Sequence, residues 1–282
     1  MMQFLKVILF VLFLIPNNHY YCISFSEFYK GTLIIIVPCD EGILVCADKR
    51  IYRSSRGNDD NFNKIIRIDN YNGFAICGAP IVSRNNVEIF NVFDILNKKL
   101  EKEKISDNIE YWNHLCDSIR SAFISTALNA PYIDWPESQF PQNNYILFQI
   151  IFFHFNVHND PKMFLLQFRY IKQINPIIEV NVYDLSVIGS FSSFGSSHVI
   201  LELQNGNKPE FDYLRNDPKL SMILKNKVTS KELNLKDAIN FCSQMIIASN
   251  KMYSLVSKID GHIGPTFDLL LLSKNGLKFL NK

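Results

Sequence analysis

Two stretches of sequence decide the fold: Gly31-Thr32-Leu33-Ile34-Ile35-Ile36-Val37, and then Cys46-Ala47-Asp48-Lys49-Arg50. The apolar runs 33–37 and 43–47 are short and are joined by a turn that contains proline and glycine, which predicts a β-hairpin. Apolar residues occupy both faces of these strands. We therefore expect each face of their sheet to be covered by another layer.

The rest of the chain alternates strand and helix patterns. A second hairpin is predicted from 64–68 and 74–77 around the turn Asp69-Asn70-Tyr71-Asn72-Gly73. Helical periodicity predicts helices over 82–105, 107–129, 194–204 and 234–256, whereas 205–231 is polar and predicts a loop. Further strands are predicted at 144–156, 162–171, 176–183, 185–189, 266–272 and 277–280. This order indicates one layered α+β domain, with two stacked sheets between helix layers.

Composition excludes several classes of function. The 282 residues are 48% apolar and 20% charged, which is typical of a chain that buries a large core. The net charge of +2 is too small to indicate a nucleic-acid partner. The aromatic run Ile151-Phe152-Phe153-His154-Phe155 lacks interleaved basic residues and therefore predicts a core strand, not a base-stacking surface.

The N-terminus has the pattern of a secretory signal peptide. Lys6 precedes nine apolar residues at 7–15, and Pro16 ends the run, which is too short for the roughly 20 residues of a membrane-spanning helix. We expect cleavage after Ser24, hence a signal over 1–24, an exported protein (periplasmic, extracellular or lumenal) and no stable membrane span afterwards. A buried N-terminal helix and an uncleaved anchor are the alternatives.

Neither a disulfide framework nor a metal site is expected. Loss of the signal leaves five widely spaced cysteines, an odd number, and no Cys-x-x-Cys or Cys/His cluster has zinc spacing. His154 and His158 flank a turn without a third ligand nearby. We therefore expect no metal and no cofactor.

The spacing of four residues carries a family resemblance. Asp48 follows Thr32 by 16 residues, Lys64 follows it by 32, and Gly78 follows it by 46. This register, with Gly-Thr at its start, resembles the β-type subunits of the proteasome, which are N-terminal-nucleophile threonine hydrolases. The resemblance implies a four-layer αββα sandwich, in which two mainly antiparallel sheets lie between helix pairs. It also implies self-association into rings, here a homo-oligomer.

The chemistry expected of such a site explains each residue type. A threonine hydroxyl needs a base to accept its proton, and an α-amine with a pKa of about 7.7–8.0 is suitable. By resemblance, cleavage after Gly31 makes Thr32 the N-terminal nucleophile. Lys64 would favour deprotonation of its hydroxyl, Asp48 would pair with Lys64, and the N–H of Gly78 would form the oxyanion hole.

Two further catalytic positions follow from the resemblance, with departures. Gly189-Ser190-Phe191 is similar to a Gly-Ser-Gly segment whose serine, here Ser190, contacts the terminal amine. Asp260 begins a segment similar to Asp-x-x-Ser-Gly-Gly, but Ile263 replaces the serine and Pro265 replaces the last glycine. The amine would therefore lose one polar neighbour.

The resemblance also indicates substrate contacts and a domain plan. Tyr52 would line the substrate groove, and Ile76 would form the floor of a pocket that favours an apolar side chain before the cut bond. The plan is a propeptide at 25–31 and a hydrolase domain at 32–282, acting on peptides or unfolded chains. Two alternatives are a non-catalytic proteasome-like subunit with a decayed site and an amidohydrolase that acts on small amides.

Overall fold

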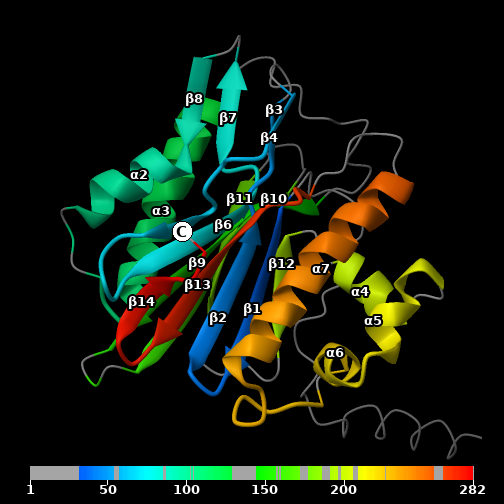
Figure 1. The fold of residues 1–282 in the computed structure, drawn as a ribbon. Helices are drawn as coiled ribbons and strands as arrows, with labels where there is room; N and C mark the ends of the chain where they lie inside the picture. The colour runs from blue at the N-terminus through cyan, green and yellow to red at the C-terminus, as the bar shows by residue number, and fades with distance from the viewer. Residues whose placement is uncertain are drawn as a thin grey trace, which may run out of the picture.

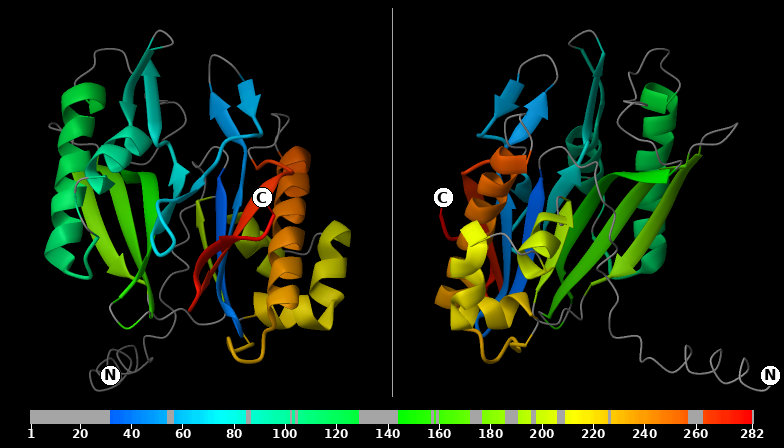
Figure 2. Two further views of the ribbon diagram at one scale, coloured as in Figure 1. Left: turned by 60° about the vertical axis from the view of Figure 1, so that its left-hand side comes forward. Right: turned by 90° about the vertical axis from the view of Figure 1, so that its right-hand side faces the viewer.

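The computed structural model describes most of the chain after residue 31. The described residues are 32–53, 57–84, 87–101, 103, 105–128, 144–156, 158, 160–171, 177–185, 191–195, 198–205, 209–225, 227–256 and 263–281. They form two sheets packed face to face, with helices on the outer face of each sheet (Figures 1 and 2). The predicted α+β sandwich of four layers, αββα, is thereby confirmed.

The first sheet contains the two strands of the opening hairpin. Its order is β12-β1-β2-β13-β14, and every pair of neighbours is antiparallel. The strands are β1 (Leu33–Cys39), β2 (Gly42–Asp48), β12 (Ser192–Gly195), β13 (Phe267–Ser273) and β14 (Gly276–Phe279). The head of β1 and the end of β2 therefore lie side by side in the sheet, since Ile34 pairs with Ala47.

The second sheet has the order β11-β10-β9-β6-β5 and is also antiparallel. Its strands are β5 (Ile65–Arg67), β6 (Gly73–Gly78), β9 (Asn144–Phe155), β10 (Pro161–Ile171) and β11 (Ile177–Asp184). Two small hairpins complete the strands: β3 (Ile51–Arg53) with β4 (Gly57–Asp59), and β7 (Ile81–Arg84) with β8 (Val87–Asn91).

The helices form the two outer layers (Figure 2). The layer on the second sheet consists of α2 (Val92–Leu100) and α3 (Ile109–Phe123), and α3 continues into a π-helical turn at Ile124–Leu128. The layer on the first sheet consists of α4 (His198–Asn205), a 3-10 turn at Pro209–Phe211, α5 (Asp212–Asn216), α6 (Pro218–Leu224) and α7 (Leu235–Val256).

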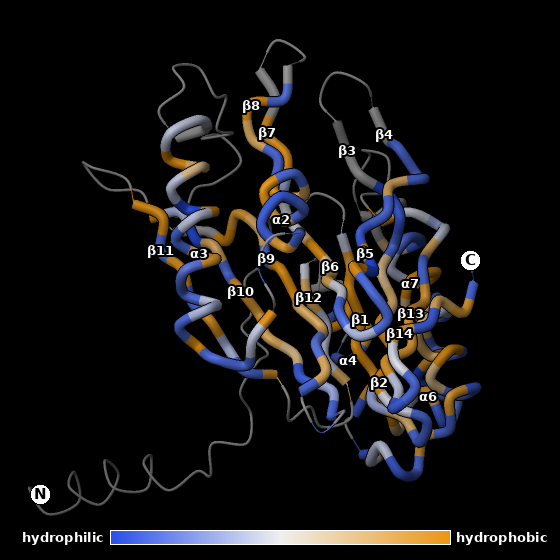
Figure 3. The backbone as a smooth tube through the Cα atoms, turned by 90° about the vertical axis from the view of Figure 1, so that its left-hand side faces the viewer, coloured by the Kyte–Doolittle hydropathy of each residue, from blue (hydrophilic) through white to orange (hydrophobic). Residues whose placement is uncertain are grey.

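Strand alternation divides the core into three layers of buried side chains. Ile34 and Ile36 point between the sheets, where they join Ile151 and Phe153 of β9. Their neighbour Ile35 points to the opposite face, towards α7. Figure 3 shows β1 and β9 as hydrophobic in colour, which agrees with strands that are covered on both faces.

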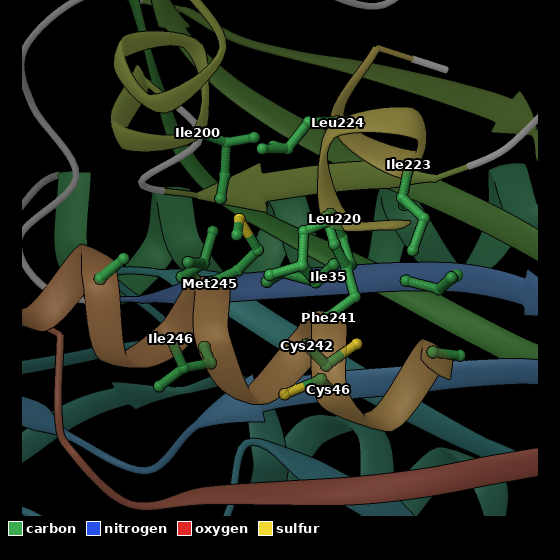
Figure 4. Close-up of a cluster of buried hydrophobic side chains, with 14 of the residues drawn as sticks. Ile35, Cys46, Ile200, Leu220, Ile223, Leu224, Phe241, Cys242, Met245 and Ile246 are labelled. Atoms are coloured by element: carbon green, nitrogen blue, oxygen red, sulfur yellow. The ribbon is translucent and has the colours of Figure 1, made fainter. Parts of the chain in front are cut away.

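The two outer core layers attach the helices to the sheets. Beneath α3, the Trp112 ring stacks on Phe164 with centroids 4.7 Å apart, and Trp112 is fully buried. Beneath α7, Phe241 and Met245 meet Ile35 of β1 and Cys46 of β2 (Figure 4). These helices therefore hold the strands that carry the candidate site.

Three sequence expectations are wrong. The helix predicted over 82–105 begins only at Val92, because residues 81–91 pair as the β7–β8 hairpin and Asn91 caps the helix by accepting from the Phe93 N–H at 2.9 Å. The predicted loop 205–231 contains α5 and α6, whose buried leucines pack under α7. The predicted helix 194–204 starts with the last residues of β12.

The long helix 234–256 and the other predicted strands are confirmed to within a few residues, except that 186–189 of the last strand in the middle block lies outside the described residues. Within the described residues, no helix is both long enough and apolar enough to cross a membrane.

Candidate active site

Thr32 lies at the head of β1 and is only 4% exposed. The next residue, Leu33, pairs with Gly195 of β12. Gly195 has a φ of +76°, and a Cβ there would lie 2.3 Å from the Thr32 carbonyl oxygen. Only glycine fits this close approach without moving Thr32.

Asp48 is the last residue of β2 and is fully buried. Its Oδ1 accepts the Leu33 N–H at 2.7 Å, and its Oδ2 accepts the N–H groups of Arg50 at 3.2 Å and Gly264 at 3.1 Å. Three backbone donors from separate parts of the chain therefore converge on one carboxylate. The bond from Leu33 connects this carboxylate directly to the residue after the candidate nucleophile.

Lys64 precedes β5, and its side chain reaches the same carboxylate. The Lys64 Nζ lies 3.0 Å from each oxygen of Asp48, and the two side chains are 3% and 0% exposed. The Lys64 carbonyl accepts the Ile76 N–H at 3.0 Å, which ties Lys64 to the start of the Ile76-Cys77-Gly78 segment. The predicted Asp48–Lys64 pair is present in the structure.

Burial acts on both members of this ion pair. It lowers the pKa of Lys64, an effect that the Asp48 charge opposes, and it raises the pKa of Asp48, an effect that Lys64 and the Leu33 and Gly264 N–H groups oppose. Taking a charge out of water favours its neutral form, whereas an opposite charge favours the ionised form. The Asp48 charge thus offsets part of the effect of burial and favours the ammonium form of Lys64.

Gly78 ends β6 with a φ of +95°, and a Cβ there would lie 2.5 Å from the Leu147 carbonyl oxygen. The preceding Cys77 is next to the site, because a Cβ on Gly195 would lie 3.1 Å from the Cys77 Cβ. Burial raises the pKa of the Cys77 thiol to about 12, and its Sγ donates to Gln149 Oε1 at 3.5 Å. Cys77 is therefore a neutral thiol and does not compete with Thr32 as a nucleophile.

The remaining predicted site residues divide into two groups. Ile76 is buried in the cluster beneath α2 and α3, and Tyr52 lies in β3, where only the backbone is described. Gly31, Ser190 and Asp260 lie outside the described residues. Their predicted roles stay predictions.

The structure places the residues that depart from the family pattern. Ile263, at the position of the serine, is fully buried among residues that pack on α7. Phe191 packs edge to face on Phe241, with ring centroids 5.2 Å apart. Pro265 is exposed. The Ile263 side chain thus belongs to the core and offers no hydroxyl to the site.

Sequence reasoning assigned no role to four residues next to the candidate site: Arg50, Asp60, Gly195 and Gly264. Arg50 and Gly264 give backbone donors to Asp48, and Gly195 packs on Thr32. Asp60 pairs with the Arg50 side chain. Arg50 and Gly264 lie within the segments that resemble the family, but a residue type in a motif does not indicate that its backbone N–H is a donor.

Within the described part of the chain, no group of three or more His, Cys, Asp and Glu side chains could hold a metal ion. The described groups that make up the candidate site are Thr32, the Asp48–Lys64 pair and the backbone N–H groups that surround Asp48.

Part of the chain is similar to known proteins. Residues 28–122 match the model of the family described as "Proteasome subunit", and this span contains Thr32, Asp48, Lys64 and Gly78. Over 120 residues, 43% of the chain, the sequence is 26% identical to a proteasome subunit beta from Methanococcus aeolicus. Over these residues the chain resembles the subunits of the proteasome.

The match to this relative is partial: it spans 51% of the length of the Methanococcus aeolicus subunit. Among solved structures, the chain is similar to an Anbu (Gly-1) mutant from Hyphomicrobium sp. strain MC1. That similarity has a TM-score of 0.46 and 13% identity, and covers 89% of this chain and 86% of that chain.

Proposed function

We propose that this chain is a threonine-type endopeptidase of the proteasome β-type family, which cuts itself between Gly31 and Thr32 and then hydrolyses peptide bonds with Thr32. The observation that carries the proposal is the fully buried Asp48–Lys64 pair, one hydrogen bond away from the residue that follows Thr32. Burying two charges costs free energy and gives weak net stability. A catalytic site that needs a positive charge near a hydroxyl would explain why the chain buries this ion pair.

The proposed self-cleavage is an acyl shift followed by hydrolysis. The Thr32 Oγ attacks the Gly31 carbonyl carbon, the C–N bond to Thr32 breaks, and an ester remains. Water then hydrolyses the ester, which leaves a carboxylate on Gly31 and a free α-amine on Thr32. In the peptidase reaction this amine accepts the hydroxyl proton and later donates it to the leaving amine.

In this scheme Lys64 stabilises the developing alkoxide, and Asp48 keeps Lys64 charged and in place. Gly78 would donate its N–H to the oxyanion, a contribution of typically about 3–4 kcal/mol. Ile76 would supply the apolar pocket floor, and Tyr52, Ser190 and Asp260 would complete the groove and the surroundings of the amine.

Intact mass together with N-terminal sequencing tests this function. We expect the wild-type chain to begin at Thr32, and the Thr32→Ala variant to keep residues 25–31. A mature wild-type chain that begins near Phe25 would refute self-processing. A screen of fluorogenic peptides against small amides then separates an endopeptidase from an amidohydrolase, and hydrolysis of apolar peptides in preference to acidic or basic ones supports the role of Ile76.

A non-catalytic, proteasome-like subunit is the second candidate, and one observation favours it. Ile263 is fully buried where the family pattern has a serine, so the site lacks one hydroxyl. Under this candidate the wild-type and Thr32→Ala chains have the same N-terminus, and neither cleaves peptides.

Assembly and location form the last part of the proposal. We propose a homo-oligomeric ring acting on peptides or unfolded proteins in an exported compartment, since proteasome subunits work in rings and residues 1–24 have the pattern of a signal peptide. Size-exclusion chromatography with light scattering tests the ring, and cell fractionation tests the location.

A further inference from the structure

Arg50 and Asp60 form a two-point ion pair beside the Asp48 carboxylate. The Arg50 Nε donates to Asp60 Oδ1 at 2.5 Å, and its Nη2 donates to Asp60 Oδ2 at 2.8 Å. Paired bonds of this kind fix the plane and direction of both groups. The Arg50 side chain is 14% exposed and that of Asp60 is 37% exposed, and Arg50 lowers the pKa of Asp60.

The backbone N–H of Arg50 donates to the Asp48 carboxylate, while the Arg50 side chain pairs with Asp60. The Arg50 N–H is one of two backbone donors on Asp48 Oδ2, and the other is Gly264. Gly264 packs directly on the ion pair: a Cβ there would lie 2.8 Å from Arg50 Cβ and 3.2 Å from Asp60 Oδ1. The Arg50–Asp60 ion pair thus restricts where the N–H groups of Arg50 and Gly264 can lie.

Further bonds connect Asp60 to the segment that carries Gly264. The Asp60 carbonyl accepts the Thr266 hydroxyl at 2.9 Å, and the Thr266 carbonyl accepts the Lys49 N–H at 2.9 Å. The end of β2, the residue after β4 and the segment 263–266 therefore form one closed unit around Asp48 Oδ2.

We propose that Arg50 and Asp60 are positioning residues, which hold the Arg50 and Gly264 N–H groups on Asp48 and so keep that carboxylate ionised beside Lys64. The effect on catalysis rests on the proposed function; the effect on the two backbone donors does not. Carboxylates that accept several N–H bonds favour the ionised form. The titratable groups around the Asp48–Lys64 pair among the described residues include Asp60, the Arg50 guanidinium and the thiols of Cys46 and Cys77.

Two variants of the full chain test this role. Asp60→Asn keeps the shape and removes the charge, whereas Arg50→Lys keeps the charge and removes the planar fork. Asp212→Asn is the matched control, because Asp212 forms an ion pair with Arg215 on α5. Hydrogen exchange at the Arg50 and Gly264 amides is measured first, since it requires no activity.

We expect both site variants to speed exchange at these two amides by about tenfold or more, and the control to leave it unchanged. Unchanged exchange in Asp60→Asn and Arg50→Lys would overturn the proposal, whether or not the chain is an enzyme.

Kinetic measurements then test whether the loss of this positioning affects peptide hydrolysis. We expect each site variant to lower the kcat for peptide hydrolysis by about tenfold with little change in KM, and to move the acid limb of the rate–pH profile upwards by about half a pH unit or more. A fall in kcat without movement of that limb would show a merely structural role. If wild type neither processes itself nor cleaves peptides, the proposed function fails, and the exchange data decide the positioning role alone.

Discussion

The Asp48–Lys64 pair permits a quantitative test through Lys64→Met. This substitution keeps an unbranched side chain that is one atom shorter and removes the charge that faces a fully buried carboxylate at 3.0 Å. Removal of one partner from a buried pair costs about 3–5 kcal/mol in the free energy of unfolding. Because three backbone N–H groups still stabilise Asp48, we expect the lower end, about 3 kcal/mol near pH 7.

The loss should depend on pH with a defined sign. Burial raises the pKa of Asp48, and Lys64 is the largest influence that opposes this rise. Without Lys64 the folded protein therefore binds a proton that the unfolded aspartate, with a pKa of about 3.9, has already released. Stability of the variant then falls by up to about 1.4 kcal/mol per pH unit as pH rises between these two pKa values.

Urea unfolding followed by the fluorescence of the buried Trp112 measures both effects. All variants carry Thr32→Ala, so that differences in processing do not enter. Lys278→Met, an exposed lysine on β14, is the control and should change stability by less than about 0.5 kcal/mol. If Lys64→Met stays within about 1 kcal/mol of its parent near both pH 5 and pH 7, the pair does not have the energetics inferred from its burial.

Three further outcomes follow from the site. Gly195→Ala should destabilise the fold by about 1–3 kcal/mol, measured by urea unfolding, and should block processing in mass spectra, because its Cβ would press on the Thr32 carbonyl. Gly78→Ala should lower peptide hydrolysis at least tenfold, since φ is +95° and the Leu147 carbonyl occupies the space of a Cβ; wild-type rates would contradict this. Cys77, with a pKa of about 12, should resist iodoacetamide at about pH 8 until the chain is unfolded, and labelling of the native protein would disprove its burial.

The sheets and the central ion pair could be predicted from the sequence for specific reasons. Strands such as Ile34-Ile35-Ile36 are apolar on both sides, so they require a layer on each face, and the structure supplies both layers. Asp48 and Lys64 lie 16 residues apart on either side of the β3–β4 hairpin, and only the family register indicated their contact.

The elements that were missed depend on tertiary contacts. In 81–91 the apolar residues Val82 and Phe90 fit both helix and strand periods, and their pairing across a hairpin decides the outcome. In 205–231 most residues are polar, and Leu214, Leu220 and Leu224 become buried only when the segment packs into the core cluster shared with α7. The Arg50–Asp60 pair could not be predicted from the sequence either, because neither residue type indicates which residue it contacts.

The replacement at position 263 is compatible with the proposed chemistry. The backbone around Ile263 keeps its contacts: its carbonyl accepts the Asn250 side-chain amide, and the next N–H donates to Asp48. In the family pattern a serine at position 263 lies near the terminal amine, so the isoleucine would leave a freed Thr32 amine with one hydrogen-bond partner fewer, which disfavours the charged ammonium. The neutral amine is the form that acts as a base. The isoleucine therefore removes a polar contact and at the same time favours the protonation state that the reaction needs, so its presence argues for an altered pH range before it argues for a dead site.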